Sequence, residues 1–290
     1  MKPQNIEEMK LHVTRINNTG CFVWAYIRWL ISACLIYASL ACERDVDQEL
    51  VTEVDEVNIT DHEEESDYTW DESGIVTLEL NGTSMATNGE GVTIKGSDAV
   101  ITAAGTYSLS GTLSDGQVTV DTEDEEVVRI LFNGVDLHNS SSSPVYIKNA
   151  YKTIIVLTDG SNNFVSDASS YSFDSQNEDE PNAAIFSDDN LTIYGNGSLT
   201  VDGNYNDGIA SKDGLIIKSG TITVNAVDDG IRGKDYLLVK GGNISIDAAG
   251  DGLKSDNDED TAAGFITIEG GTIDISSMED AITAETDVYI

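Results

Sequence analysis

Acidic residues recur at regular intervals in the C-terminal half of this chain, whose formal net charge is -37. Two positions before an apolar residue, the sequence repeatedly places an aspartate: Asp207, Asp229, Asp251 and Asp280. If the repeats stacked in register, neighbouring carboxylates about 4.8 Å apart would repel by roughly 3.5 kcal/mol at an effective dielectric constant near 20. Such a column of acids therefore calls for a compensating cation.

Calcium suits these residues best. It takes about six to eight oxygen ligands and accepts carboxylates in irregular geometry, whereas Mg2+ demands a stricter octahedron. Zn2+ is disfavoured because the body of the chain offers very few histidines and no cysteine after Cys42. We therefore predict Ca2+ as the cofactor. One ion is expected at Asp207, Asp228, Asp229 and Asp235, another at Asp251, Asp256 and Asp258, with Asp213 and Asp280 as further metal ligands. The alternative is that Asp-Gly pairs only form solvated turns.

Four basic residues accompany the acids: Lys212, Arg232, Lys234 and Lys254. They could simply balance the negative charge. They could also bind a ligand together with Ca2+, and the carboxylates of a uronic-acid polymer are the ligand that these residues would favour. A nucleic-acid partner is excluded, since so acidic a surface repels phosphates.

These residues belong to an internal repeat of about 22 residues. The apolar residues after the aspartates are spaced by 22, 22 and 29 positions: Ile209, Ile231, Leu253 and Ile282. Each repeat holds three short apolar segments separated by turns that are too short for a crossover helix. The pattern predicts an all-β, three-faced parallel β-helix in which each repeat forms one coil.

The first 42 residues are predicted to be a lipoprotein signal. An apolar run from Trp29 to Ala41 follows basic residues and ends at Cys42, which would be lipidated after cleavage. The alternative is an uncleaved membrane anchor from Trp24 to Ala41. In both cases we expect an exported, monomeric protein at a bacterial surface. If the segment is a lipoprotein signal, we expect the lipid anchor to be the only contact with the membrane.

The remaining chain divides into two parts. Residues 43–73 are acidic and aperiodic, which predicts a disordered tether. Residues 74–290 are predicted to form the β-helix domain, and we expect its coils to continue beyond Ile290 because the last repeat stops in mid-coil.

Several phrases of the sequence resemble those of a bacterial surface family, the carbohydrate-binding domain-containing proteins: GVTIKGSDAVITAAGTYSLSGTLSDGQVTV, PNAAIFSDDNLTI, YNDGIASKD, AVDDGIRGKD and GDGLKSDNDED. The resemblance implies a right-handed parallel β-helix that binds several Ca2+ ions and is related in architecture to calcium-dependent pectate lyases. It also implies binding of polygalacturonate and cellulosic material. The calcium motif of those lyases has an acid directly after the apolar residue, where this chain has Arg232 and Lys254.

Three functions fit these observations. We prefer a calcium-dependent carbohydrate-binding module for acidic polysaccharide such as polygalacturonate, with no catalytic residue. A polysaccharide lyase would use Lys212, Lys234 or Lys254 as its base, but acidic neighbours raise the pKa of a lysine and oppose that role. The third possibility is a structural or adhesive surface rod without a defined ligand.

Overall fold

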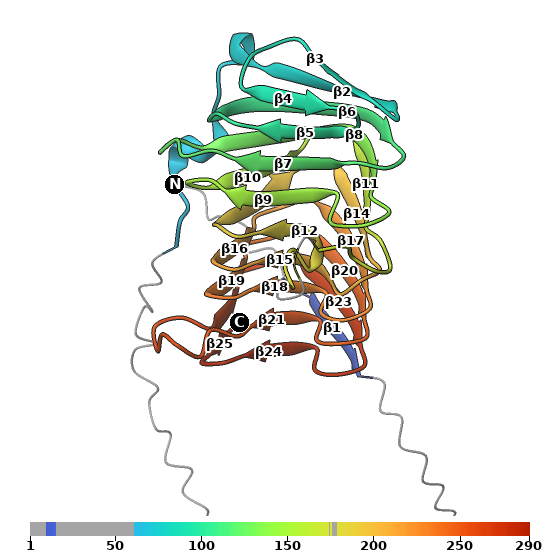
Figure 1. Ribbon diagram of the computed structural model, residues 1–290. Coiled ribbons are helices and arrows are strands. Elements are labelled where there is room, and N and C mark those ends of the chain that lie inside the picture. The colour runs from blue at the N-terminus through green and yellow to red at the C-terminus, as the bar shows by residue number, and fades with distance from the viewer. Residues whose placement is uncertain (1–9, 16–60, 174, 176–178) are drawn as a thin grey trace, which may run out of the picture. The chain divides into compact units, whose positions relative to one another are not determined.

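The computed structural model describes residues 10–15, 61–173, 175 and 179–290. This part of the chain is all-β apart from two short 3-10 turns, η1 (Glu65–Tyr68) and η2 (Glu72–Gly74). Its strands form a parallel β-solenoid of about seven turns (Figure 1), which confirms the predicted fold class. No helix among these residues is long and apolar enough to cross a membrane. Except for β1 (Lys10–Arg15), the predicted signal lies outside the described residues.

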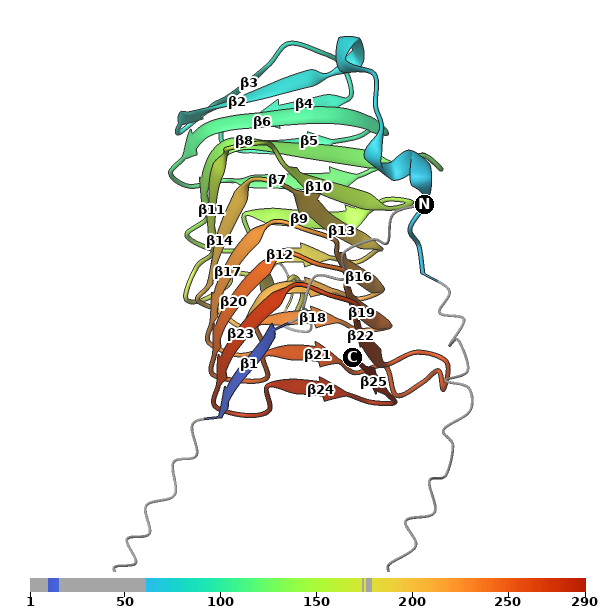
Figure 2. The same cartoon turned by 180° about the vertical axis from the view of Figure 1, so that it is seen from behind.

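Each complete turn contributes one strand to each of three faces (Figures 1 and 2). Face 1 is a nine-stranded sheet that contains β4 (Val92–Lys95), β5 (Asp98–Ile101), β7 (Gln117–Asp121), β9 (Val145–Asn149), β12 (Ala183–Ser187), β15 (Asp207–Ser211), β18 (Ile231–Gly233), β21 (Leu253–Ser255) and β24 (Ile282–Ala284). Face 2 contains β10 (Thr153–Leu157), β13 (Leu191–Gly195), β16 (Gly214–Ile217), β19 (Tyr236–Val239), β22 (Phe265–Ile268) and β25 (Val288–Tyr289). Face 3 contains β11 (Asn162–Ser166), β14 (Ser198–Gly203), β17 (Thr221–Ala226), β20 (Asn243–Ala248) and β23 (Thr272–Ser277), with β1 paired to β23.

The strand β8 (Val128–His138) belongs to two faces, because its first residues pair with β10 and its last residues pair with β11. Above it lie β6 (Gly105–Leu113), β2 (Val76–Gly82) and β3 (Met85–Thr87). The pairs β2–β3 and β4–β5 are antiparallel hairpins. These hairpins close the first end of the solenoid and cover strand edges that would otherwise accept a further chain.

Apolar residues of successive turns form ladders inside the solenoid. Ile209 pairs with Ile231, and Ile231 with Leu253, as the repeat spacing predicts. All three side chains are fully buried. Burying a side chain of this size contributes about 1.5–3 kcal/mol, so these ladders hold the turns in register.

The glycine after each of the first three aspartates is required by the close approach of the next turn, whereas Asp280 is followed by Ala281. A Cβ atom on Gly208 would lie 2.8 Å from the carbonyl oxygen of Gly230. On Gly230 it would lie 2.7 Å from the carbonyl oxygen of Gly252. A side chain has no room at these positions, so the repeated Asp-Gly pair is a packing requirement in addition to a turn signal.

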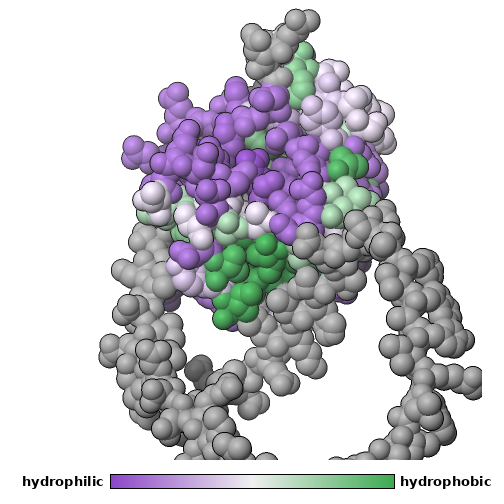
Figure 3. All heavy atoms as spheres, turned by 90° about the horizontal axis from the view of Figure 1, so that it is seen from below, coloured by the Kyte–Doolittle hydropathy of each residue, from purple (hydrophilic) through white to green (hydrophobic). Residues whose placement is uncertain are grey.

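The lower end of the solenoid exposes an apolar patch. In the view from below, this patch adjoins a broad hydrophilic area (Figure 3). Partly buried residues such as Ile282 and Ala284 pack against the core there, while Met278 and Val288 are exposed. The apolar residues Ile282 and Ala284 of the last turn are thus less covered than their counterparts in the turns above.

The final part of the predicted tether does not behave as a solvated chain. Residues 62–74 include η1 and η2 and contact the solenoid, and Asp67 is completely buried. Lys152, also buried, donates hydrogen bonds to Asp67 and to the carbonyl oxygen of His62. The prediction of disorder was therefore wrong for this segment, because lysines of the solenoid bind its acidic side chains.

Candidate functional site

The four aspartates of the sequence repeat lie at one corner of the solenoid, where face 3 turns into face 1. Asp207 is the first residue of β15, and Asp229, Asp251 and Asp280 precede β18, β21 and β24. The first three are almost completely buried, while Asp280 is exposed. Stacking of the turns therefore brings these residues into one column, which we call the aspartate column.

Backbone amides satisfy one oxygen of each buried aspartate. The Oδ1 atom of Asp207 accepts the amide of Asp229 at 3.2 Å. Asp229 accepts the amide of Asp251 at 2.8 Å, and Asp251 accepts the amide of Asp280 at 2.9 Å. Each of these three carboxylates thus accepts a hydrogen bond from the main chain of the next member of the column.

Two basic side chains neutralise the other oxygens. Lys254 Nζ lies 2.8 Å from Asp229 Oδ2 and 3.3 Å from Asp251 Oδ2. Arg232 lies 3.9 Å from Asp207 Oδ2, and its Nε and Nη2 atoms approach Asp256 at 3.0 and 2.9 Å. Arg232 and Lys254 are register partners on β18 and β21. Charge balance is consequently one role of both residues.

Part of the repulsion nevertheless persists at the upper end of the column. Burial and the neighbouring Asp229 raise the pKa of Asp207 to about 8, although Arg232 acts in the opposite direction. Burial and Asp229 also raise the pKa of Asp228. Oxygens of Asp207, Asp228 and Asp229 lie within 4.8 Å of one another, and Asp228 is exposed. These three predicted ligands therefore converge on a cluster that is open to solvent.

The other predicted metal ligands lie elsewhere. Asp213 and Asp235 follow β15 and β18 at the opposite corner, between face 1 and face 2, where burial and the charge of Asp235 raise the pKa of Asp213 to about 6. Asp256 is paired with Arg232, and Asp258 is exposed in the insertion after β21. In the described part of the chain, the predicted group of Asp251, Asp256 and Asp258 does not converge as the first cluster does.

The remaining two basic residues differ in their surroundings. Lys212 Nζ lies 2.6 Å from Glu180 and 3.2 Å from Asp188, and these hydrogen bonds raise its pKa. Lys234 makes no ion pair within the described residues and is partly exposed. No pattern in the sequence indicates the Glu180 contact, because this residue lies 32 positions away in a connecting segment outside the repeat.

A family model, that of the carbohydrate-binding domain-containing proteins, matches residues 95–290, which include the solenoid turns and the aspartate column. The chain belongs to this family. A carbohydrate-binding domain-containing protein of Acetivibrio thermocellus is 47% identical over 225 residues, which are 75% of this chain and 79% of the relative. A solved structure of a polysaccharide lyase-like protein from C. thermocellum, a gadolinium derivative, is similar with a TM-score of 0.70 and 34% identity. That likeness covers 74% of this chain and 96% of the other.

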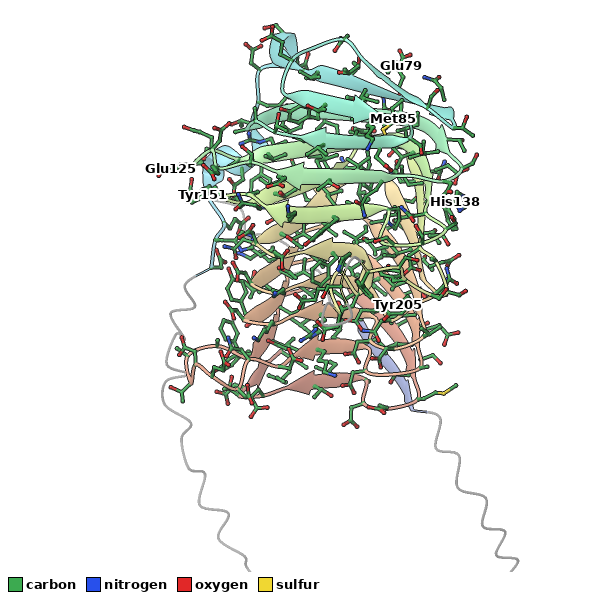
Figure 4. All side chains as sticks on the ribbon, in the orientation of Figure 1. Glu79, Met85, Glu125, His138, Tyr151 and Tyr205 are labelled. Atoms are coloured by element: carbon green, nitrogen blue, oxygen red, sulfur yellow. The ribbon has the colours of Figure 1, made fainter. Side chains whose placement is uncertain are left out.

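Exposed aromatic platforms are a common way to bind sugars, and this carbohydrate-binding domain has one candidate near the column. Tyr205, labelled in Figure 4, lies in the turn between β14 and β15. It stacks on Tyr171, with ring centroids 4.2 Å apart and an interplanar angle of 16°. Phe186 is buried, and Tyr236 stacks on Phe265. Among these rings, Tyr205 is therefore the one that is both close to Asp207 in sequence and partly exposed.

Proposed function

We propose that this domain binds acidic polysaccharide on face 1 and that Ca2+ held by Asp207, Asp228 and Asp229 mediates the binding. The observation that carries the proposal is the convergence of these three carboxylates within 4.8 Å beside a row of basic residues. Family membership supports a carbohydrate ligand. The related structure was obtained as a gadolinium derivative, and gadolinium, like calcium, is a hard cation that prefers oxygen ligands.

The cluster has the donors that calcium requires. Three carboxylates provide part of a shell of about six to eight oxygens, and the exposed side of Asp228 leaves room for water or a ligand carboxylate. The side-chain oxygen of Asn182 is buried without a hydrogen-bond partner, and the backbone carbonyl of this residue accepts the amide of Asp207. A bound ion would supply positive charge that both the column and a uronate could share.

Basic residues would position the polymer. Arg232 and Lys254 project from adjacent strands of face 1, one turn apart, and Lys234 is the least engaged cation beside them. Because strands of neighbouring turns are about 4.8 Å apart, a polymer that runs along the solenoid meets these two basic groups on successive turns. We infer that this row orients the uronate carboxylates over the aspartate column.

Lyase chemistry is less well supported. A lysine base must be neutral to remove a proton, so a lowered pKa favours it. Asp229 and Asp251 raise the pKa of Lys254 despite its burial, and Glu180 and Asp188 raise that of Lys212. Both lysines are therefore held in the charged form, which suits binding.

The test is retention of the domain on immobilised polygalacturonate with Ca2+ or with a chelator. We expect retention with Ca2+, loss with chelator, and no ultraviolet absorbance from unsaturated products. Asp228→Asn should weaken calcium binding at least tenfold in calorimetry, whereas the exposed Asp258→Asn, with the same change of charge, should not. Chelator-insensitive retention, or equal calcium binding by both variants, would contradict the proposal.

We further propose export through the N-terminal segment and lipidation at Cys42. Metabolic labelling with a fatty acid should mark the wild-type protein and not Cys42→Ser. Labelling of both proteins, or of neither, would contradict lipidation at this cysteine.

A further inference from the structure

A row of basic residues runs along face 2. The calcium cluster lies elsewhere, at the corner between face 3 and face 1. The row begins at Arg129 in β8 and continues with Lys152, directly before β10. Lys218 and Lys240 follow β16 and β19. We call these four residues the basic stripe. They are four of the ten lysines and arginines between residues 61 and 290, in a chain with a formal net charge of -37.

An acidic segment of the same chain covers the whole stripe. We call residues 62–68 the strap, and Figure 2 shows it beside β10, β13 and β16. The carboxylate of Glu63 bridges Lys218 and Lys240, with one oxygen bound to each ammonium group. Lys218 Nζ also lies 3.7 Å from the ring centroid of Tyr68. One carboxylate thus joins two successive turns of the solenoid.

The upper part of the strap repeats this arrangement. Lys152 Nζ donates to Asp67 Oδ2 at 2.9 Å and to the carbonyl oxygen of His62 at 2.8 Å. Arg129 donates to the carbonyl oxygens of Asp67 and Ser66, both at 2.9 Å. All four members of the stripe therefore bind oxygens of the strap, and the three lysines bind two of its carboxylates, Glu63 and Asp67.

We propose that the basic stripe is a second site for acidic polysaccharide, independent of calcium, and that the strap occupies it in the free protein. The proposal takes its ligand class from the proposed function. A chain of uronates presents a series of carboxylates, and Glu63 and Asp67 of the strap likewise present two carboxylates to the stripe. Since the stripe is itself positive, it needs no bridging cation, in contrast to the aspartate column.

The strap would control access by competition. An intramolecular segment acts at a high effective concentration, so a polymer can displace it only when strap contacts are weakened or when many polymer contacts form at once. Displacement breaks the Glu63 bridge first, because Glu63 and Lys218 are partly exposed, whereas the Asp67–Lys152 pair is buried. The site is therefore closed in the wild-type protein, and its lower half becomes accessible when Glu63 loses its charge.

The experiment measures polygalacturonate binding by the full chain in chelator and at low salt. Glu63→Gln should bind at least tenfold more tightly than wild type, and Glu63→Gln with Asp67→Asn more tightly still. High salt should abolish the gain, because exposed ion pairs are screened. Glu63→Gln leaves the buried Asp67–Lys152 pair intact, so it tests the proposal even if the double variant fails to fold.

The matched control is Glu65→Gln with Glu72→Gln, which removes two exposed acids near or in the strap that make no contact with the stripe. It should bind as wild type does. An equal gain in this control, or no gain in Glu63→Gln, would overturn the proposal. The experiments distinguish the two proposed sites. Calcium-dependent retention of wild type, without tighter binding by Glu63→Gln in chelator, would support the site on face 1 and contradict the basic stripe. Tighter binding by Glu63→Gln, without calcium-dependent retention of wild type, would support the basic stripe and contradict the site on face 1.

Discussion

The backbone amide of Asp251 donates to Asp229 Oδ1 at 2.8 Å, so one aspartate of the column binds the main chain of the next turn. The same bond links Asp207 to Asp229 and Asp251 to Asp280. A carboxylate at this position therefore has a structural task, whether or not a metal binds. The column couples the stacking of turns to the charge that would attract calcium.

Replacing Asp229 separates these two tasks. Asp229→Ala removes the acceptor of the buried Asp251 amide and the partner of Lys254, and should lower the free energy of unfolding by about 1–3 kcal/mol. Asp229→Asn keeps an acceptor oxygen and should cost less in stability, yet it should weaken calcium binding as much as the alanine does. Urea unfolding in chelator and calcium calorimetry measure the two effects. Equal losses of stability in both variants would contradict the structural role.

Gly230 tests the close approach of the turns. In Gly230→Ala the new Cβ atom would lie 2.7 Å from the carbonyl oxygen of Gly252 and 2.4 Å from Ile246 Cγ2. Overpacking of this kind costs about 1–3 kcal/mol, and urea unfolding should show it. Gly74→Ala is the matched control, because nothing lies within 4 Å of a Cβ atom there. Equal stability of the two variants would mean that neighbouring turns separate easily.

The fold was predictable because its signal is repeated. Ile209, Ile231 and Leu253 recur at the coil length, and the same spacing places the aspartates in one column. The sequence predicted only part of the carboxylate cluster. Lys254 forms an ion pair with Asp251, and Arg232 forms one with Asp256, so these two acids do not join it. Their choice of partner depends on side-chain rotamers, which a repeat pattern does not encode.

The strap was not predictable from composition. Its acidic, aperiodic sequence is that of a disordered segment. It is ordered because Glu63 meets Lys218 and Lys240, which are 155 and 177 positions away. No local pattern reports contacts over such distances in the chain.

Lys254 distinguishes calcium binding from simple charge balance. Its ammonium group lies between Asp229 and Asp251 and competes with any cation at the column. Lys254→Met should therefore raise calcium affinity roughly tenfold, about 1.4 kcal/mol, and lower stability in chelator. Calorimetry and urea unfolding with and without Ca2+ measure both effects. The exposed Lys148→Met, which breaks a surface pair with Asp121, is the control. Unchanged calcium affinity in Lys254→Met would favour charge balance alone.

Glu63 should make the strap sensitive to acid. Burial raises its pKa, but hydrogen bonds from Lys218, Lys240 and Tyr68 outweigh this effect and lower the pKa to about 2. Because the folded value is below the ordinary 4.5, the stabilisation by Glu63 is complete above about pH 4.5 and is lost as the pH falls towards 2. The strap should therefore detach from the lower half of the basic stripe in this range.

Trp70 follows the upper end of the strap and packs near Leu131, Ile154 and Val156, so its fluorescence reports detachment that spreads along the strap from Glu63. With Trp24 and Trp29 replaced by phenylalanine, its fluorescence should change between pH 4.5 and 2 in wild type. In Glu63→Gln the signal should already be shifted at pH 6 and should vary less with acid, since the remaining pH dependence comes only from other carboxyl groups. Identical titrations of the two proteins would show that Glu63 does not hold the strap.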